Sequence, residues 1–199
     1  MSMLLFHTPT SPFVRKVTVL AREIGAPLET TFLRPTPLQA DPTLSKENPL
    51  NKIPVLVTPD GPLYDSAVIC EYLDRENKMI PASGAARFRV LRLQALCDGI
   101  LEAGVAIFYE KTTRPPELHF EPWLRGQAVK LNQALDALEL EVVSFSSTVD
   151  LAQICAGITL GWLEFRKPVG DIRENRPKLF RWYEAFRQRP SMKDTEPHA

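Results

Sequence analysis

Ile53 and Pro54 could bind the main chain of a small peptide. Pro54 opens a predicted strand over residues 55–57, and bonds that precede proline are where cis peptides occur in proteins. A cis bond would turn the N–H and C=O of Ile53 outward, where an extended peptide can pair with them like an added strand. This pair of residues therefore predicts a backbone clamp.

Asp65 stands immediately before a predicted helix over residues 66–76, and Ser66 is at its start. Asp and Ser are favoured N-cap residues, and the first N–H groups of a helix favour a bound carboxylate. A peptide clamp and an anion site therefore lie close together in the sequence. An ordinary hairpin followed by a capped helix explains the same residues equally well.

Ser11 is a further candidate, because it lies between a predicted strand over residues 3–7 and a predicted helix over residues 13–24. Pro12 suits the first helical position and Gly25 suits the left-handed exit of that helix. On residue type alone, Ser11 is an N-cap.

The elements that must position these residues follow from the pattern of apolar side chains. After the first strand and helix, residues 29–33 favour a strand, and the proline-rich residues 34–51 predict a loop with at most one short helix. A hairpin then turns at Pro59-Asp60-Gly61 and leads into the 66–76 helix. The first strand–helix–strand passage is expected to be a right-handed parallel crossover.

The second half of the chain predicts helices alone. Residues 77–86 break the pattern and indicate a linker. Apolar side chains recur at helical spacing, and the predicted helices cover residues 87–109, 122–145 and 151–165. Asn175 and Pro177 start a predicted last helix, and Pro190 ends it. Ser147-Thr148-Val149-Asp150 predicts a capping box ahead of the 151–165 helix.

Composition excludes several classes of protein. Lys plus Arg and Asp plus Glu both number 24 among 199 residues, and this balance argues against a nucleic-acid or membrane-surface protein. The three cysteines are far apart and lie in apolar helical contexts, which indicates buried thiols in a reducing compartment. We expect a cytoplasmic protein with no signal peptide, no membrane span and no metal site.

Three sequence blocks together resemble the cytosolic glutathione S-transferases, specifically the bacterial members with a catalytic serine. The blocks are Thr10–Lys16, Asn48–Leu56 and Tyr64–Leu73. The resemblance covers nearly the whole chain and implies a thioredoxin-like α/β domain over residues 1–80 followed by an all-helical domain over residues 85–199.

The resemblance also implies roles for single residues. Ser11 would donate its hydroxyl to the glutathione sulfur and stabilise the thiolate, with the neighbouring Thr10 as the alternative donor. The main chain at Ile53, shaped by Pro54, would bind the cysteinyl backbone. The side chains of Asp65 and Ser66 would bind the γ-glutamyl end. Lys52 would bind the glycyl carboxylate.

The resemblance places the second, electrophilic substrate against the helical domain. Candidate contacts are Phe108, Tyr109 and Trp162, although core packing explains each of them as well. A two-fold homodimer is expected, in which Asp98 would reach the glutathione of the partner subunit or, alternatively, pair with a local arginine. The expected activity is glutathione transfer to a hydrophobic electrophile, as in detoxification. Glutathione-dependent isomerisation, dehalogenation or peroxide reduction, and a non-catalytic binding or regulatory role, are the alternatives.

Overall fold

The computed structural model describes residues 3–198 and divides them into two compact units. The first unit contains residues 3–90 and 190–198, and the second contains residues 91–189. Helix α4 (Gly84–Thr113) runs through the boundary. The sequence predicted a boundary at residues 80–85 and did not anticipate that the end of the chain returns to the first unit.

A four-stranded sheet in the order β2-β1-β3-β4 forms the base of the first unit. Its strands are β1 (Leu4–His7), β2 (Glu29–Phe32), β3 (Val55–Thr58) and β4 (Gly61–Leu63). Strands β1 and β2 are parallel, as the predicted crossover requires, and β3 runs antiparallel to both β1 and β4. The fold is therefore the thioredoxin-like arrangement that the sequence predicted.

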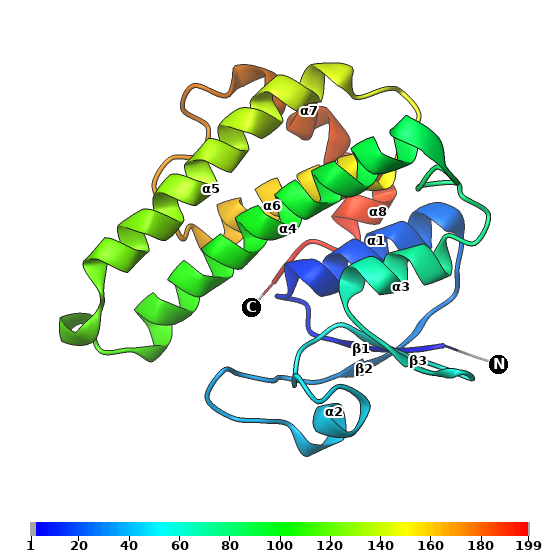
Figure 1. The fold of residues 1–199 in the computed structure, drawn as a ribbon, viewed down its shortest axis with the longest axis horizontal. Coiled ribbons are helices and arrows are strands. Elements are labelled where there is room, and N and C mark those ends of the chain that lie inside the picture. The colour runs from blue at the N-terminus through cyan, green and yellow to red at the C-terminus, as the bar shows by residue number, and fades with distance from the viewer. Residues whose placement is uncertain (1–2, 199) are drawn as a thin grey trace. The chain divides into compact units, whose positions relative to one another are not determined.

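Helices α1 (Pro12–Ile24) and α3 (Ser66–Leu73) lie side by side on one face of this sheet, and the short helix α2 (Pro42–Glu47) lies on the other side (Figure 1). The predicted ends of α1 are confirmed. Ser11 is its N-cap, and Gly25 adopts the left-handed conformation (φ 74°) in which its N–H bonds to the last turn.

The end of the chain packs against α1 through a second short helix, α8 (Pro190–Lys193). The buried Arg15 of α1 donates to the carbonyl of Met192 over 2.8 Å, and Arg22 pairs with Asp194 over 2.7 Å. Pro190 therefore begins a helix instead of merely ending the preceding one. Proline suits this position because its missing N–H is not needed in a first helical turn.

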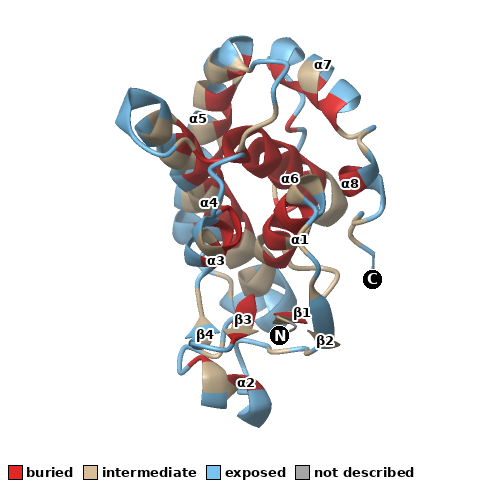
Figure 2. Cartoon of the chain, turned by 90° about the vertical axis from the view of Figure 1, so that its right-hand side faces the viewer, coloured by how far each residue is buried: buried red, intermediate tan, exposed pale blue. Residues whose placement is uncertain are grey.

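The second unit is helical, as predicted. It contains most of α4, then α5 (Glu121–Glu141), α6 (Leu151–Arg166) and α7 (Pro177–Phe186), with short 3₁₀ turns at Pro116–Leu118 and Val142–Ser144. Residues 151–163 of α6 are all buried, so this helix forms the centre of the unit (Figure 2). A helix that is apolar on all sides is expected in such a position.

The N-cap of α6 is Asp150, and the predicted cap at Ser147 is wrong. The Asp150 side chain accepts the N–H of Gln153 over 3.0 Å, and the Gln153 side chain accepts the N–H of Asp150 over 3.1 Å. The reciprocal pair is a capping box displaced by three residues from the predicted one. Ser147 is exposed and lies outside the helix.

The three cysteine thiols are buried and form no disulfide with one another. Within residues 3–198, no helix is both long enough and apolar enough to cross a membrane.

Candidate functional site

Strand register brings three of the predicted site regions to one end of the sheet. Phe6 of β1 pairs with Val55 of β3, so the carboxyl end of β1 lies beside the start of β3. Leu63 of β4 pairs with Leu56, so the end of β4 lies beside the same start of β3. Ser11 is in the segment that follows β1, Ile53-Pro54 is in the segment that precedes β3, and Asp65-Ser66 is in the segment that follows β4. All three segments therefore meet at this end of the sheet.

Ser11 holds its hydroxyl at the start of α1. Its backbone is extended (φ −82°, ψ 122°), and its Oγ accepts the N–H of Val14 over 3.3 Å. This cap uses only an acceptor site of the hydroxyl. Within the described part of the chain, the Ser11 hydroxyl proton has no hydrogen-bond acceptor, and the residue is only partly buried. The serine can therefore donate to a bound atom while it caps the helix.

A thiol placed at Ser11 would be acidified by its surroundings. An ordinary thiol has a pKa of about 8.5 and is mostly protonated at neutral pH. A hydroxyl donor and the positive end of a helix both stabilise the charged form, so both lower the thiol pKa. Each unit of that shift corresponds to about 1.4 kcal/mol of interaction. Thr10 is adjacent and also partly buried, so it stays the alternative donor.

The Ile53–Pro54 peptide is cis, which confirms the prediction from the sequence. The Ile53 side chain packs against a cluster formed by Phe6, Leu44 and Val55. Its backbone N–H and C=O form no hydrogen bond with any residue between 3 and 198. Since an unpaired backbone group readily accepts an added strand, this position can bind the main chain of an extended peptide.

Asn48 fixes the loop that leads to this peptide, and the sequence did not suggest this role. The Asn48 side chain is 2% exposed. Its Nδ2 donates to the carbonyl of Lys52 over 2.8 Å, and its Oδ1 accepts the N–H of Leu50 over 3.0 Å. The sequence signal for this role was an asparagine directly before a proline in a loop, Asn48 before Pro49. The same pattern also occurs in ordinary turns, so it did not single out Asn48.

The third region is the N-terminus of α3. Asp65 is its N-cap, and its Oδ1 accepts the N–H of Ala67 over 2.9 Å. Ser66 is 3% exposed, and neither its hydroxyl nor its N–H is hydrogen-bonded within the described residues. The Tyr64–Asp65 peptide is also cis. The helix start thus presents an unused hydroxyl and N–H to an anion, together with a carboxylate suited to an ammonium group.

Lys52 is exposed, and its ammonium forms no ion pair in the described structure. It follows the Asn48 loop directly and is adjacent to Ile53. A carboxylate at the far end of a peptide bound to Ile53 would lie within the region that this flexible side chain samples.

The three candidates for the second substrate belong to the helical unit and differ in exposure. Trp162 is 3% exposed, and a Cβ added at Gly104 would lie 2.8 Å from its ring atom Cζ3, so Trp162 is a core residue packed on the backbone of α4. Phe108 and Tyr109 are partly buried, with ring centroids 5.5 Å apart in an edge-to-face arrangement. Phe108 and Tyr109 are therefore the more exposed of the three candidates, and Trp162 belongs to the core.

Two family descriptions match this chain. Residues 10–76 match the glutathione S-transferase N-terminal domain, and residues 121–185 match the glutathione S-transferase C-terminal domain. The chain belongs to the glutathione S-transferase family. Among the described residues of this family member, no group of three His, Cys, Asp or Glu side chains could hold a metal ion.

Relatives of this transferase family member include proteins of known structure. A glutathione transferase family member from Pseudomonas fluorescens Pf-5, solved with bound glutathione, is 44% identical, with a TM-score of 0.96 and full coverage of both chains. A structure from Methylobacillus flagellatus with glutathione bound is 36% identical, with a TM-score of 0.87, and the match covers 99% of this chain and 100% of that one. The uncharacterized GST-like protein YibF of Escherichia coli is 37% identical over 98% of each chain.

Proposed function

We propose that this chain is a glutathione transferase that binds glutathione on its first unit, lowers the pKa of its thiol and transfers it to a hydrophobic electrophile. The hydroxyl of Ser11 carries this proposal, because it keeps an unused donor at the start of α1. The family membership and the glutathione-bound relatives support the choice of ligand.

The three regions at the end of the sheet match the parts of glutathione in order. The main chain of Ile53, beside Pro54, pairs with the cysteinyl residue. Ser66 and the start of α3 bind the γ-glutamyl carboxylate, and Asp65 binds its ammonium group. Lys52 binds the glycyl carboxylate. This arrangement leaves the sulfur for Ser11 or Thr10, and the thiolate then attacks the electrophilic carbon.

A second Pseudomonas fluorescens Pf-5 structure suggests what kind of electrophile is used. It is 43% identical over 99% of this chain and all of that chain, with a TM-score of 0.91, and it was solved with bound S-(propanoic acid)-glutathione. The group on the sulfur of that ligand carries a carboxyl group. We therefore include electrophiles that bear a carboxylate among the proposed substrates.

The proposal is tested by titrating the thiol of bound glutathione in four proteins: the wild type, Ser11→Ala, Ser11→Thr and Thr10→Val. Ultraviolet absorbance of the thiolate against pH reports its pKa. We expect Ser11→Ala to retain glutathione, to raise the thiol pKa and to lower turnover of 1-chloro-2,4-dinitrobenzene at least tenfold, a factor equal to about 1.4 kcal/mol. Ser11→Thr keeps a hydroxyl and is the matched control.

The outcomes separate the alternatives. A raised pKa in Thr10→Val alone would transfer the role to Thr10. Failure of the wild type to bind glutathione in isothermal titration calorimetry would refute the proposal and favour a non-catalytic role. Normal binding and thiolate formation without conjugation would refute the transfer reaction and favour glutathione-dependent isomerisation, dehalogenation or peroxide reduction.

We also propose that the functional form is a two-fold homodimer. Asp98, which is partly buried in α4, would then contact the glutathione bound to the partner subunit. Sedimentation analysis tests the dimer. If the role of Asp98 is correct, Asp98→Asn weakens glutathione binding in the dimer.

A further inference from the structure

Arg166, at the end of α6, contacts two aromatic rings. Its guanidinium carbon is 4.6 Å from the centroid of the Phe108 ring and 4.5 Å from the centroid of the Phe165 ring. Arg166 is the basic residue in the last turn of this helix, where the helix dipole favours a cation. Cation–π contacts with two rings restrict the position of the guanidinium.

Within residues 3–198, the N–H groups of this guanidinium have no hydrogen-bond acceptor. A guanidinium has five N–H donors, which lie in its plane and remain available when the cation contacts an aromatic ring. Arg166 forms no hydrogen bond or ion pair with any residue that the structure describes, and it is only partly exposed. By contrast, Arg173 and Arg176 in the same unit each bind a carboxylate.

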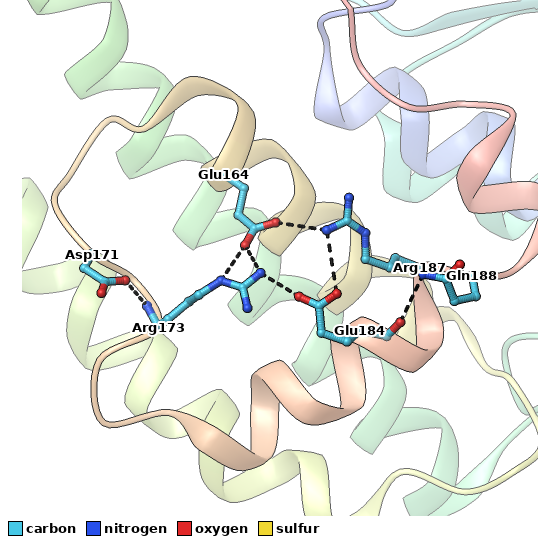
Figure 3. A network of polar contacts seen from close by, with 6 residues as sticks. All are labelled: Glu164, Asp171, Arg173, Glu184, Arg187 and Gln188. Atoms are coloured by element: carbon cyan, nitrogen blue, oxygen red, sulfur yellow. Dashed lines mark hydrogen bonds and ion pairs between the residues drawn. The ribbon is translucent and has the colours of Figure 1, made fainter.

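Neighbouring acidic residues already have other partners. Glu164, two residues before Arg166, is bound by Arg173 and Arg187 in a network that also includes Glu184 (Figure 3). These arginines come from the loop before α7 and from the end of α7, so the Glu164 carboxylate is paired with residues other than Arg166.

Glu110 of α4 is engaged in the same way. Its Oε2 accepts from Arg114 over 3.0 Å, and its Oε1 accepts the N–H of Phe120 over 3.3 Å. Burial raises the pKa of Glu110, but these two hydrogen bonds, together with the charges of Arg114 and His119, outweigh burial and hold the pKa below its ordinary value. Glu110 therefore stays ionised and bound to its own partners.

The surroundings of Arg166 suit an anion with an apolar body. Burial lowers the pKa of Arg166, since desolvation disfavours its charge, and the Tyr109 side chain opposes that shift. The ammonium of Lys111 donates to the carbonyl of Pro168 over 3.1 Å and adds positive charge close to the end of α6. A partly desolvated guanidinium without a counter-ion binds a carboxylate more strongly than an exposed one does.

We infer that Arg166 binds the carboxylate of the electrophilic substrate, whose apolar part lies against Phe108 and Tyr109. The inference rests on the proposed transferase function and narrows its substrates to electrophiles that carry a carboxylic acid. Arg166 is a specificity-determining residue, because it contacts the second substrate at a group that does not react.

A matched pair of aryl chlorides tests the inference: 4-chloro-3,5-dinitrobenzoate and its methyl ester. In both, the thiolate sulfur of glutathione forms a bond to the chlorine-bearing carbon, and chloride leaves with the electron pair of the broken bond. The two substrates differ in charge at the opposite end of the ring. The ratio of kcat/KM for the acid to kcat/KM for the ester therefore reports recognition of the carboxylate.

We expect Arg166→Gln to lower this ratio at least tenfold, since hydrogen bonds to charged groups discriminate by about that factor or more. Arg166→Lys keeps a charge but loses the planar pair of donors. Its acid-to-ester ratio should therefore lie between those of the wild type and Arg166→Gln. Arg125→Gln is the matched control, because Arg125 is exposed on α5 and has no ion pair in the described structure. It should keep the wild-type ratio. An equal ratio in wild type and Arg166→Gln would overturn the inference.

A binding measurement distinguishes failure of this inference from failure of the transferase function. 3,5-Dinitrobenzoate and its methyl ester lack the leaving group, and calorimetric titration gives their affinities without glutathione. If the wild type prefers the acid and Arg166→Gln does not, the anion site stands even where no conjugation occurs. If the wild type has no preference, the inference fails even where conjugation is normal. Thermal denaturation of each variant verifies that it is folded.

Discussion

The side-chain amide of Asn48 donates to the carbonyl oxygen of Lys52 over 2.8 Å and so fixes the residue that precedes Ile53. A second bond, from the N–H of Leu50 to Asn48 Oδ1, closes the loop. Asn48 is not among the residues proposed to contact glutathione, yet it sets the position of the backbone that is proposed to bind it.

Asn48→Asp should weaken glutathione binding, because it keeps the acceptor for Leu50 but loses the donor to Lys52. An unsatisfied buried group costs about 1–3 kcal/mol, and we expect a comparable loss of unfolding free energy. Chemical denaturation and calorimetric titration with glutathione measure the two effects. If Asn48→Asp binds glutathione as the wild type does, the loop has no positioning role.

The cap of α6 predicts which of two nearby residues controls stability. Asp150→Ala removes the acceptor for the Gln153 N–H and should cost about 1–2 kcal/mol of unfolding free energy. Ser147→Ala, three residues earlier, should have a negligible effect because Ser147 is exposed and lies outside the helix. Urea denaturation compares the two variants, and a larger loss in Ser147→Ala would contradict the observed cap.

Two glycines in helices should respond to alanine in opposite directions. Alanine usually stabilises a helix interior relative to glycine by about 1 kcal/mol. At Gly104 the added Cβ would lie 2.8 Å from the rigid ring of Trp162, so Gly104→Ala should destabilise by about 1–3 kcal/mol. At Gly126 on α5, no atom of the described residues outside the local helix backbone lies within 4 Å of the added Cβ, so Gly126→Ala should stabilise. Thermal denaturation of both variants tests the contact, and equal shifts would refute it.

His7 should make the folded state less stable in mild acid. Partial burial lowers the pKa of His7, so the unfolded chain binds its proton more readily than the folded chain does. Stability from this group is therefore complete above the ordinary histidine pKa of about 6.5 and falls as the pH decreases below it.

Urea midpoints measured at about pH 7.5 and about pH 5.5 bracket that pKa. We expect the wild type to lose more stability than His7→Gln between these two conditions. Proton NMR of the imidazole measures the pKa directly, and a value above the ordinary one would contradict the expected direction.

Local patterns in the sequence predicted much of the first unit correctly. Ser11, Pro12 and Gly25 specified the ends of α1, and the apolar run with its leading proline specified β3 and the cis bond before it. Caps, turns and short strands depend on a few adjacent residues, so their signals can be read from the chain. Two acceptable caps close together, Ser147 and Asp150, were the exception, because only contact with Gln153 decides between them.

The sequence by itself determined the family, the order of the strands and of the longer helices, and the three segments that lie at one end of the sheet, but not α8. Only the tertiary structure decided that Asn48 donates to Lys52 and that Trp162 packs on Gly104. It also decided that Arg173 and Arg187 pair with Glu164, whereas the N–H donors of Arg166 have no acceptor among the described residues. The physical reason is that side-chain pairing is a competition among groups that the fold brings together, whether they are near or distant in sequence. Its outcome depends on which carboxylates and carbonyls the fold brings within reach.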